Sequence, residues 1–163
     1  MRSEVVWRGV VHVGATPVVV VGYKNSAAGR HALETAIGLA GPLGAVVHVV
    51  HVVELGDYPV DPDSEDWEEW GRMNLELIGE QVSTYIRDLP GATFSVERGD
   101  PARVLHEMAD EEGTVMIVVG LPTKGVGPLA RLFTHPVSTS VTKHVHTPVL
   151  LVPLPDAQST ARS

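Results

Sequence analysis

Four short Val-rich runs are the feature that most constrains what this chain can fold into. They cover residues 18–21, 45–53, 115–119 and 149–152. Continuous apolar runs of this length, rich in β-branched side chains, predict strands that are buried on both faces of a sheet. A fifth segment, 93–96, alternates polar and apolar residues and predicts another strand. The chain is therefore expected to build a sheet that helices cover on both sides.

Segments with apolar residues at helical spacing separate the predicted strands. The first helix follows Ser26, whose hydroxyl can cap a helix N-terminus, and Gly41-Pro42 is predicted to end it. A long helix is predicted over about 66–89, and a third begins with Asp100 as its cap. A fourth is predicted over 137–145.

The long helix over 66–89 is predicted to bury one apolar stripe. We assign to this stripe Trp67, Trp70, Leu77, Ile78, Val82, Tyr85, Ile86 and Leu89. Trp67 and Trp70 are interpreted as core or interface anchors, and their acidic sequence neighbourhood offers contact with another protein as a second interpretation.

Strands that alternate with helices predict an α/β fold: one doubly wound open sandwich with a five-stranded, mainly parallel sheet and helices on both faces. We expect a single domain over 18–154, an N-terminal extension over 1–17 and a flexible tail over 155–163. Ligands of such folds bind beyond the carboxyl ends of the strands. The loops at 22–26, 52–54 and 120–138 are predicted to meet there.

Charge and composition exclude several classes of function. The 163 residues carry 20 acidic side chains against 12 Lys and Arg, a net charge of −8, which disfavours general binding to nucleic acid or anionic membranes. The absence of cysteine excludes disulfides and thiol catalysis. No apolar run reaches the about 18 residues that a membrane span requires, and the N-terminus makes a poor signal peptide, so a cytoplasmic location is expected.

Several short motifs occur in one order along the chain. They are 20–26 followed by Ala32-Leu33, then 51–54, 99–102, 118–120, 129–133, Val137-Ser138 and 147–152. In this order they resemble the universal stress protein family. The resemblance implies the strand order 3-2-1-4-5 and a homodimer formed through the last strand, Val149 to Val152. An apolar edge strand of this kind needs cover, which agrees with a dimer.

The nucleotide-binding branch of that family carries an Asp after the first strand, which meets adenosine, and a glycine signature that approaches the phosphates. In this chain Lys24 replaces the Asp, and His135-Pro136 replaces the final Gly-Ser pair. The loop after Gly120 is longer than in the family, so that Gly125 is the glycine that precedes the spacer of the signature. His135 carries a Cβ that crowds a phosphate, and Pro136 lacks an N–H donor. The standard ATP signature is therefore interpreted as broken.

Part of a binding site nevertheless remains. We predict a cofactor-binding set at the loops beyond the strand ends: Gly22, Tyr23, Lys24, Val52, Val119, Gly120, Lys124, Gly125, Gly127, His135, Val137 and Ser138. No cofactor is required by the sequence, and the resemblance allows ATP or another adenine nucleotide.

Two functions follow from these observations. The favoured one is a stress-response regulatory module that acts through dimerisation and contact with an unknown protein partner, with its standard ATP site degraded. The alternative is an adenine-nucleotide sensor with a remodelled phosphate loop. Neither is an enzyme, because the chain has no Gly-x-Ser-x-Gly motif and no identifiable general base, so even slow ATP hydrolysis is not expected.

Other sites are weighed against these two. A flavin-binding, flavodoxin-like module stays open as an alternative, although the loop after Gly22 is not rich in Ser and Thr. A phosphoacceptor domain would need acids at that point. His48 and His51 are expected on opposite faces of one strand, and His144 and His146 have no carboxylate near them in sequence, so no metal site is predicted.

Overall fold

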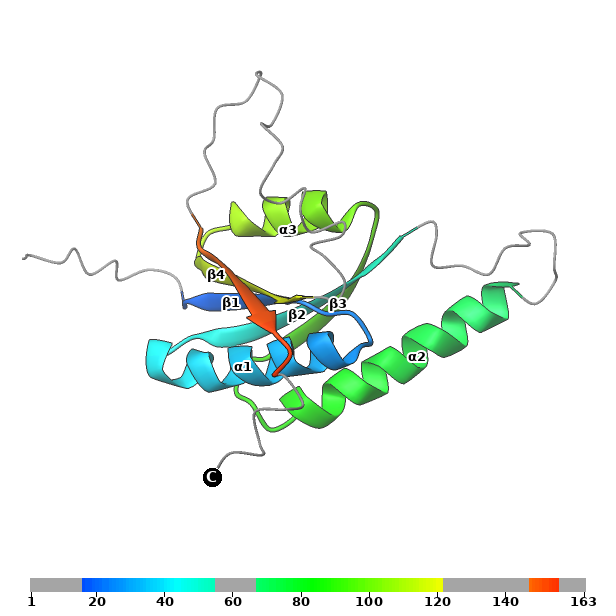
Figure 1. The fold of residues 1–163 in the computed structure, drawn as a ribbon, viewed down its shortest axis with the longest axis horizontal. Helices are drawn as coiled ribbons and strands as arrows, with labels where there is room; N and C mark the ends of the chain where they lie inside the picture. Colours follow the sequence, from blue (N-terminus) through cyan, green and yellow to red (C-terminus); the bar gives the residue numbers. More distant parts are fainter. Residues whose placement is uncertain (1–15, 55–66, 122–146, 156–163) are drawn as a thin grey trace, which may run out of the picture.

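The computed structural model of the chain describes residues 16–54, 67–121 and 147–155 (Figure 1). Its centre is a five-stranded sheet in the order β3-β2-β1-β4-β5, and every neighbouring pair is parallel. The α/β class predicted from the sequence is confirmed, and so is the strand order that the family resemblance implies.

The strands and helices alternate along the chain with these bounds. The strands are β1 (Val18–Gly22), β2 (Val46–Val53), β3 (Thr93–Arg98), β4 (Thr114–Leu121) and β5 (Val149–Pro153). The described helices are α1 (Ala27–Leu43), α2 (Trp67–Ile86) and α3 (Pro101–Ala109). The helix predicted over 137–145 lies outside the described residues.

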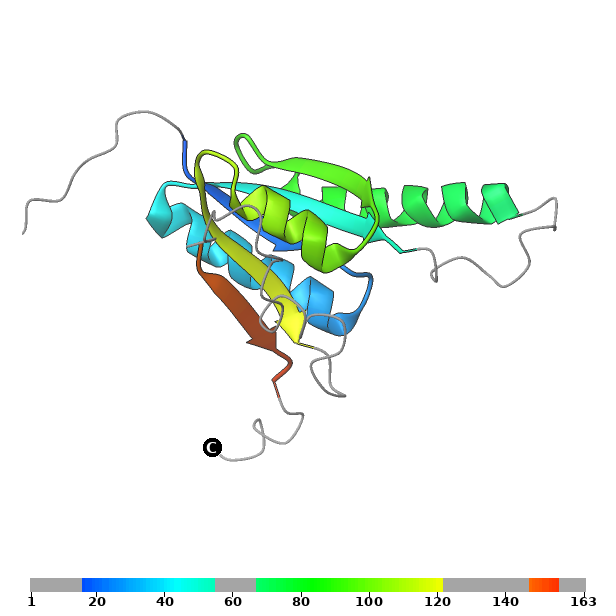
Figure 2. The same ribbon diagram turned by 90° about the horizontal axis from the view of Figure 1, so that it is seen from above.

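Helices cover both faces of the sheet. Figures 1 and 2 show α1 and α2 on one side and α3 on the other. The side chains of β1 pack alternately into the two helix layers, because successive side chains of a strand point to opposite faces. Val19 and Val21 join the core under α1 and α2, whereas Val20 packs with Val104 and Leu105 of α3.

The predicted caps of α1 and α3 are confirmed. The Ser26 hydroxyl accepts a hydrogen bond from the Gly29 N–H at 3.0 Å, and an Asp100 carboxylate oxygen accepts one from the Arg103 N–H at 3.3 Å. Both residues satisfy donors that a helix N-terminus leaves without an intrahelical partner. Both caps stand at the sheet edge where the preceding strand ends.

The predicted end of α1 is wrong. The helix continues through Pro42 to Leu43 and ends at Gly44, whose φ of 60° is left-handed. Pro42 removes one N–H donor but lies in the last turn, and Gly44 donates to the carbonyl of Gly41. Glycine adopts the left-handed conformation without a steric penalty, so Gly44 supplies the stop that Gly41-Pro42 does not.

The predicted buried stripe of α2 is only partly correct. Ile78, Val82 and Ile86 are buried in the core, but Trp70 and Leu77 are 64% and 54% exposed. With about 100° of rotation per residue, these two residues lie on a different side of the helix from Ile78, Val82 and Ile86. The core assignment of Trp70 is therefore wrong, while its assignment as an interface anchor stays a prediction.

In the described part of the chain, no helix is both long and apolar enough to cross a membrane.

Candidate functional site

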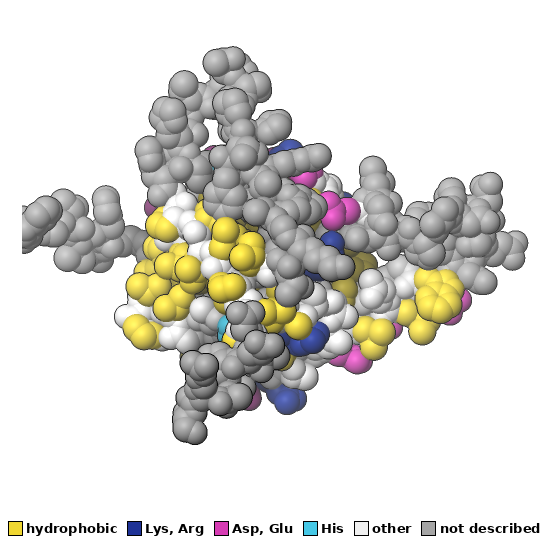
Figure 3. All heavy atoms as spheres, in the orientation of Figure 1, with side chains coloured by type: hydrophobic (Ala, Val, Ile, Leu, Met, Phe, Trp, Pro, Cys, Tyr) yellow, Lys and Arg dark blue, Asp and Glu magenta, His cyan; other side chains and the backbone are white. Residues whose placement is uncertain are grey.

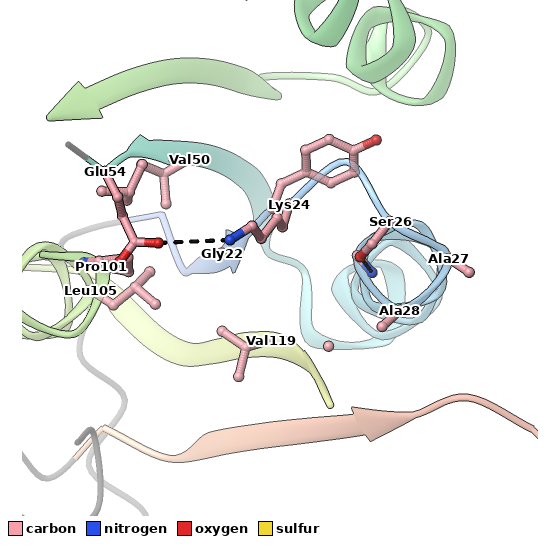
Figure 4. A pocket seen from close by; sticks show the side chains of 14 residues that line it. Gly22, Lys24, Ser26, Ala27, Ala28, Val50, Glu54, Pro101, Leu105 and Val119 are labelled. Carbon is pink, nitrogen blue, oxygen red and sulfur yellow. Dashed lines mark hydrogen bonds and ion pairs between the residues drawn. The ribbon is translucent and has the colours of Figure 1, made fainter. Parts of the chain in front are cut away.

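A cavity of about 320 Å³ opens where β1, β2 and β4 end (Figure 4). It lies at the carboxyl edge of the parallel sheet, the place where open α/β folds bind ligands. Its lining comes from three strand ends, the start of α1 and the start of α3: Gly22, Tyr23, Lys24, Ser26, Ala27, Ala28, Gly29, Val50, Val52, Glu54, Pro101, Leu105, Val119 and Gly120.

The turn between β1 and α1 is held in place by two glycines. A Cβ on Gly29 would overlap the backbone carbonyl oxygen of Lys24, so only glycine fits there. A Cβ on Gly120 would lie 2.5 Å from the carbonyl oxygen of Ala28. Both positions let backbone approach backbone, which draws the first turn of α1 against the end of β4.

A buried histidine of β2 also stabilises this turn. His51, 7% exposed, places its Nδ1 3.0 Å from the carbonyl oxygen of Tyr23. A carbonyl only accepts, so Nδ1 carries the proton in this contact. The Tyr23 ring is buried, its hydroxyl donates to Gln81 at 3.5 Å, and burial raises the pKa of that hydroxyl, which the charge of Arg30 partly offsets.

One ion pair spans the cavity. The Lys24 ammonium and the Glu54 carboxylate lie 3.7 Å apart, and Figure 4 shows the two side chains reaching toward one another from the ends of β1 and β2. The Lys24 side chain is 68% exposed, so water screens the pair and its contribution to stability is small. An anion in the cavity would compete with Glu54 for Lys24.

The remaining walls are mostly apolar. Val50 and Val52 of β2, Val119 of β4 and Leu105 of α3 line the cavity, with Pro101 at the start of α3. Such a surface suits the flat faces of a planar ring, and a few polar groups at its rim can orient the bound molecule. Among the described lining residues, the cavity therefore combines an apolar interior with one cation and one carboxylate.

The first turn of α1 adds donors to this rim. The Gly29 N–H is bonded to Ser26, and helix geometry leaves the N–H groups of Ala27 and Ala28 without an intrahelical acceptor. The positive end of the α1 helix dipole lies at the same first turn, and it favours a negatively charged group there.

Half of the predicted site residues surround this cavity. Gly22, Tyr23, Lys24, Val52, Val119 and Gly120 line it, whereas Lys124, Gly125, Gly127, His135, Val137 and Ser138 lie outside the described residues. The sequence reasoning missed Ala27, Ala28, Gly29, Val50, Pro101 and Leu105 as lining residues. It placed Ser26 and Glu54 in ligand-side loops without assigning them to the site. The Pro101 signal for a helix start was available, but its position beside the cavity depends on the crossover to α3.

The two histidines of β2 lie apart, as predicted. His51 contacts the α1 side of the sheet, whereas His48 places Nδ1 2.6 Å from Thr93 Oγ1 and Nε2 3.0 Å from Ser95 Oγ. Burial lowers the pKa of His48, and the charges of Glu111 and Glu97 oppose this shift. In residues 16–54, 67–121 and 147–155, no three His, Asp or Glu side chains come together as a metal site would need.

The fold and the cavity define an open α/β domain with a ligand-sized cleft at the carboxyl edge of its sheet. Residues 16–153 match the model of the universal stress protein family. The chain belongs to this family, which confirms the resemblance seen in its motifs. No curated protein matches the chain at a significant level.

Solved structures share this fold at low sequence identity. A universal stress protein family member from Burkholderia pseudomallei is 24% identical, with a TM-score of 0.54 over 84% of this chain and 96% of that one. A universal stress protein from Archaeoglobus fulgidus in complex with dAMP is 20% identical, with a TM-score of 0.55 over 85% and 98%. A family protein from Arabidopsis thaliana with AMP bound is 17% identical, with a TM-score of 0.52 over 90% and 97%.

Proposed function

We propose that this chain is a regulatory module that binds an adenine nucleotide in the cleft beyond β1, β2 and β4. The observation that carries the proposal is the cavity itself, with apolar walls and Lys24 at its rim. Its volume of about 320 Å³ falls at the small end of the range for small-molecule sites, about 300–1,000 Å³. A ligand of nucleoside monophosphate size suits this space better than a larger cofactor.

The groups around the cavity match the parts of such a ligand. The apolar surface of Val52, Leu105 and Val119 suits the faces of a base, and Lys24 with the start of α1 suits a phosphate. Two structural neighbours were solved with dAMP and with AMP, which supports a monophosphate as the first ligand to test. This favours the function that the sequence offered as the alternative.

The proposed function includes no catalytic step. Glu54 is the carboxylate among the described lining residues, and it is paired with Lys24 rather than held for proton transfer. A ligand that binds and is released unchanged would signal by stabilising one state of the protein.

The experiment is a calorimetric titration with AMP, ADP, ATP and cyclic AMP, with and without magnesium. We expect saturable binding of at least one nucleotide and binding about tenfold weaker in Lys24→Glu, because attraction to the phosphate becomes repulsion. Arg87→Glu is the matched control, because Arg87 is exposed beyond the end of α2, away from the cavity lining. Absence of binding at millimolar concentrations of all four nucleotides would refute the proposal.

We propose in addition that two copies associate through β5. Among the described strands β5 has a neighbour on one side only, β4, and its residues Val149, Leu150 and Leu151 are only partly buried. An apolar edge strand offers unpaired backbone groups to a second chain, and a symmetric pairing of two such edges removes both.

A further inference from the structure

Helix α2 carries an apolar face that the core does not use. Trp70, Met73 and Leu77 are 64%, 49% and 54% exposed. Their spacing of three and four residues places them in one row along the helix. Figures 1 and 2 show the first half of α2 extending past the sheet, and Figure 3 shows hydrophobic side chains gathered at that end.

The buried contacts of α2 lie elsewhere on the helix. Ile78, Val82 and Ile86 pack into the core with α1 and the sheet. With about 100° per residue, the centre of this buried row lies about 145° around the helix from the centre of the exposed row. The core cluster that holds Ile78, Val82 and Ile86 does not include Trp70, Met73 or Leu77, and exposed apolar rows of this kind mark contact surfaces.

Acidic side chains border this row on one side. Glu69, Glu76 and Glu80 are exposed and follow one another along the flank next to Met73 and Leu77. Glu76 forms an ion pair with Arg72 at 3.2 Å, so its charge is partly neutralised. Glu69 and Glu80 therefore contribute most of the negative charge of this flank. A complementary partner would present cations opposite them.

A second copy of the chain, packed antiparallel along α2, does not satisfy this charge pattern. Two α2 helices packed antiparallel about a twofold axis would bring the acidic flank of each helix against that of the other. Like charges facing one another destabilise helix pairs, and the net charge of −8 adds to the repulsion. An occupant that is apolar along one row and basic beside it avoids this repulsion and complements the acidic flank.

We infer that the Trp70–Met73–Leu77 row of α2 docks the apolar face of a basic amphipathic helix from another protein. Trp70 is the anchor, because a large aromatic side chain contributes much of the binding free energy in such interfaces. Lys or Arg residues of the partner helix face Glu69 and Glu80. The surface shares no residue with the cavity lining, so the inference stands independently of nucleotide binding.

The experiment uses the intact protein and a fluorescein-labelled model peptide of leucine and lysine, about 14 residues long, with its leucines in one helical row. A scrambled peptide of the same composition and a peptide with Glu in place of Lys are the controls. We expect micromolar anisotropy binding of the first peptide alone. Trp70→Gln with Leu77→Gln should weaken it at least tenfold, whereas Leu43→Gln, at an exposed apolar position on α1, should not.

A charge reversal separates the inference from general electrostatic attraction. Glu69→Lys with Glu80→Lys should weaken binding of the lysine peptide at least tenfold and confer binding of the glutamate peptide. Equal binding of the scrambled peptide, or no binding by the intact protein up to about 0.1 mM, would overturn the inference. A shift from dimer to monomer in Trp70→Gln with Leu77→Gln would also overturn it, in favour of a second copy.

Discussion

Gly29 and Gly38 lie in the same helix but have opposite surroundings. A Cβ at Gly29 would overlap the Lys24 carbonyl oxygen, whereas a Cβ at Gly38 would meet nothing within 4 Å. Alanine has a higher helix propensity than glycine by about 1 kcal/mol, so propensity alone predicts that both substitutions stabilise the fold. At Gly29 the steric overlap turns this expected stabilisation into a destabilisation, because backbone atoms cannot move aside as a flexible side chain can.

We therefore expect Gly29→Ala to lower the free energy of unfolding by about 1–3 kcal/mol and Gly38→Ala to raise it by about 0.5–1 kcal/mol. Urea unfolding followed by circular dichroism measures both. Equal stabilisation of the two variants would show that the turn before α1 relaxes freely and that Gly29 is not needed for its geometry.

His48 makes stability depend on pH. Burial lowers its folded-state pKa below the unfolded value of about 6.5. Below that value the unfolded state takes up a proton that the folded state resists, so stability falls as the pH is lowered through about 6.5 and is unaffected well above it.

The difference in melting temperature between the wild type and His48→Gln measures this effect. We expect the wild type to lose more stability than the variant between pH 8 and pH 5, because Gln does not titrate. A difference that stays constant across this range would mean that His48 has the same proton affinity in the folded and unfolded states.

At the scale of elements, β1, β2, β4 and β5 could be predicted from sequence because each is short and nearly all apolar, and β3 because polar and apolar residues alternate at its start. β1, β2 and β5 begin within a residue of the predicted positions, and β4 extends two residues past its predicted end. The end of α1 was harder to predict. Pro42 suggests a stop, but a proline in the last turn loses only one hydrogen bond, and the left-handed Gly44 decides the boundary.

Helix α2 shows what periodicity leaves undecided. Its apolar residues occupy two faces, and the spacing alone does not tell which face meets the sheet. The choice depends on tertiary contacts such as those of Ile78 and Val82 with the buried strands. The candidate site has the same limit: the loops after β1 and β2 could be placed from the strand ends, but Leu105 reaches the cavity only because α3 crosses over the sheet.

At the scale of the whole molecule, the proposed dimer through β5 is the next prediction. We expect sedimentation velocity at micromolar concentration to give twice the monomer mass of 17.4 kDa. Leu151→Lys should shift the protein to monomers, because a charge on an edge strand opposes pairing with a second edge.

Leu43→Lys introduces the same charge at an exposed position on α1 and should leave the dimer intact. The melting temperature of each variant controls for loss of folding. A wild-type protein that sediments as a monomer at these concentrations would rule out the proposed dimer.

The strand order also has a consequence in time. Among the described strands β1 is synthesised first yet becomes the central strand: Val18 pairs with Val46 on one side and with Thr114 on the other. At about 5–20 residues per second, the second partner is synthesised about 5–20 seconds after β1. During that interval one edge of the nascent sheet, all valine from position 18 to 21, is open to any other unpaired strand. A chaperone that shields this stretch during translation would protect the nascent chain from aggregation in that interval.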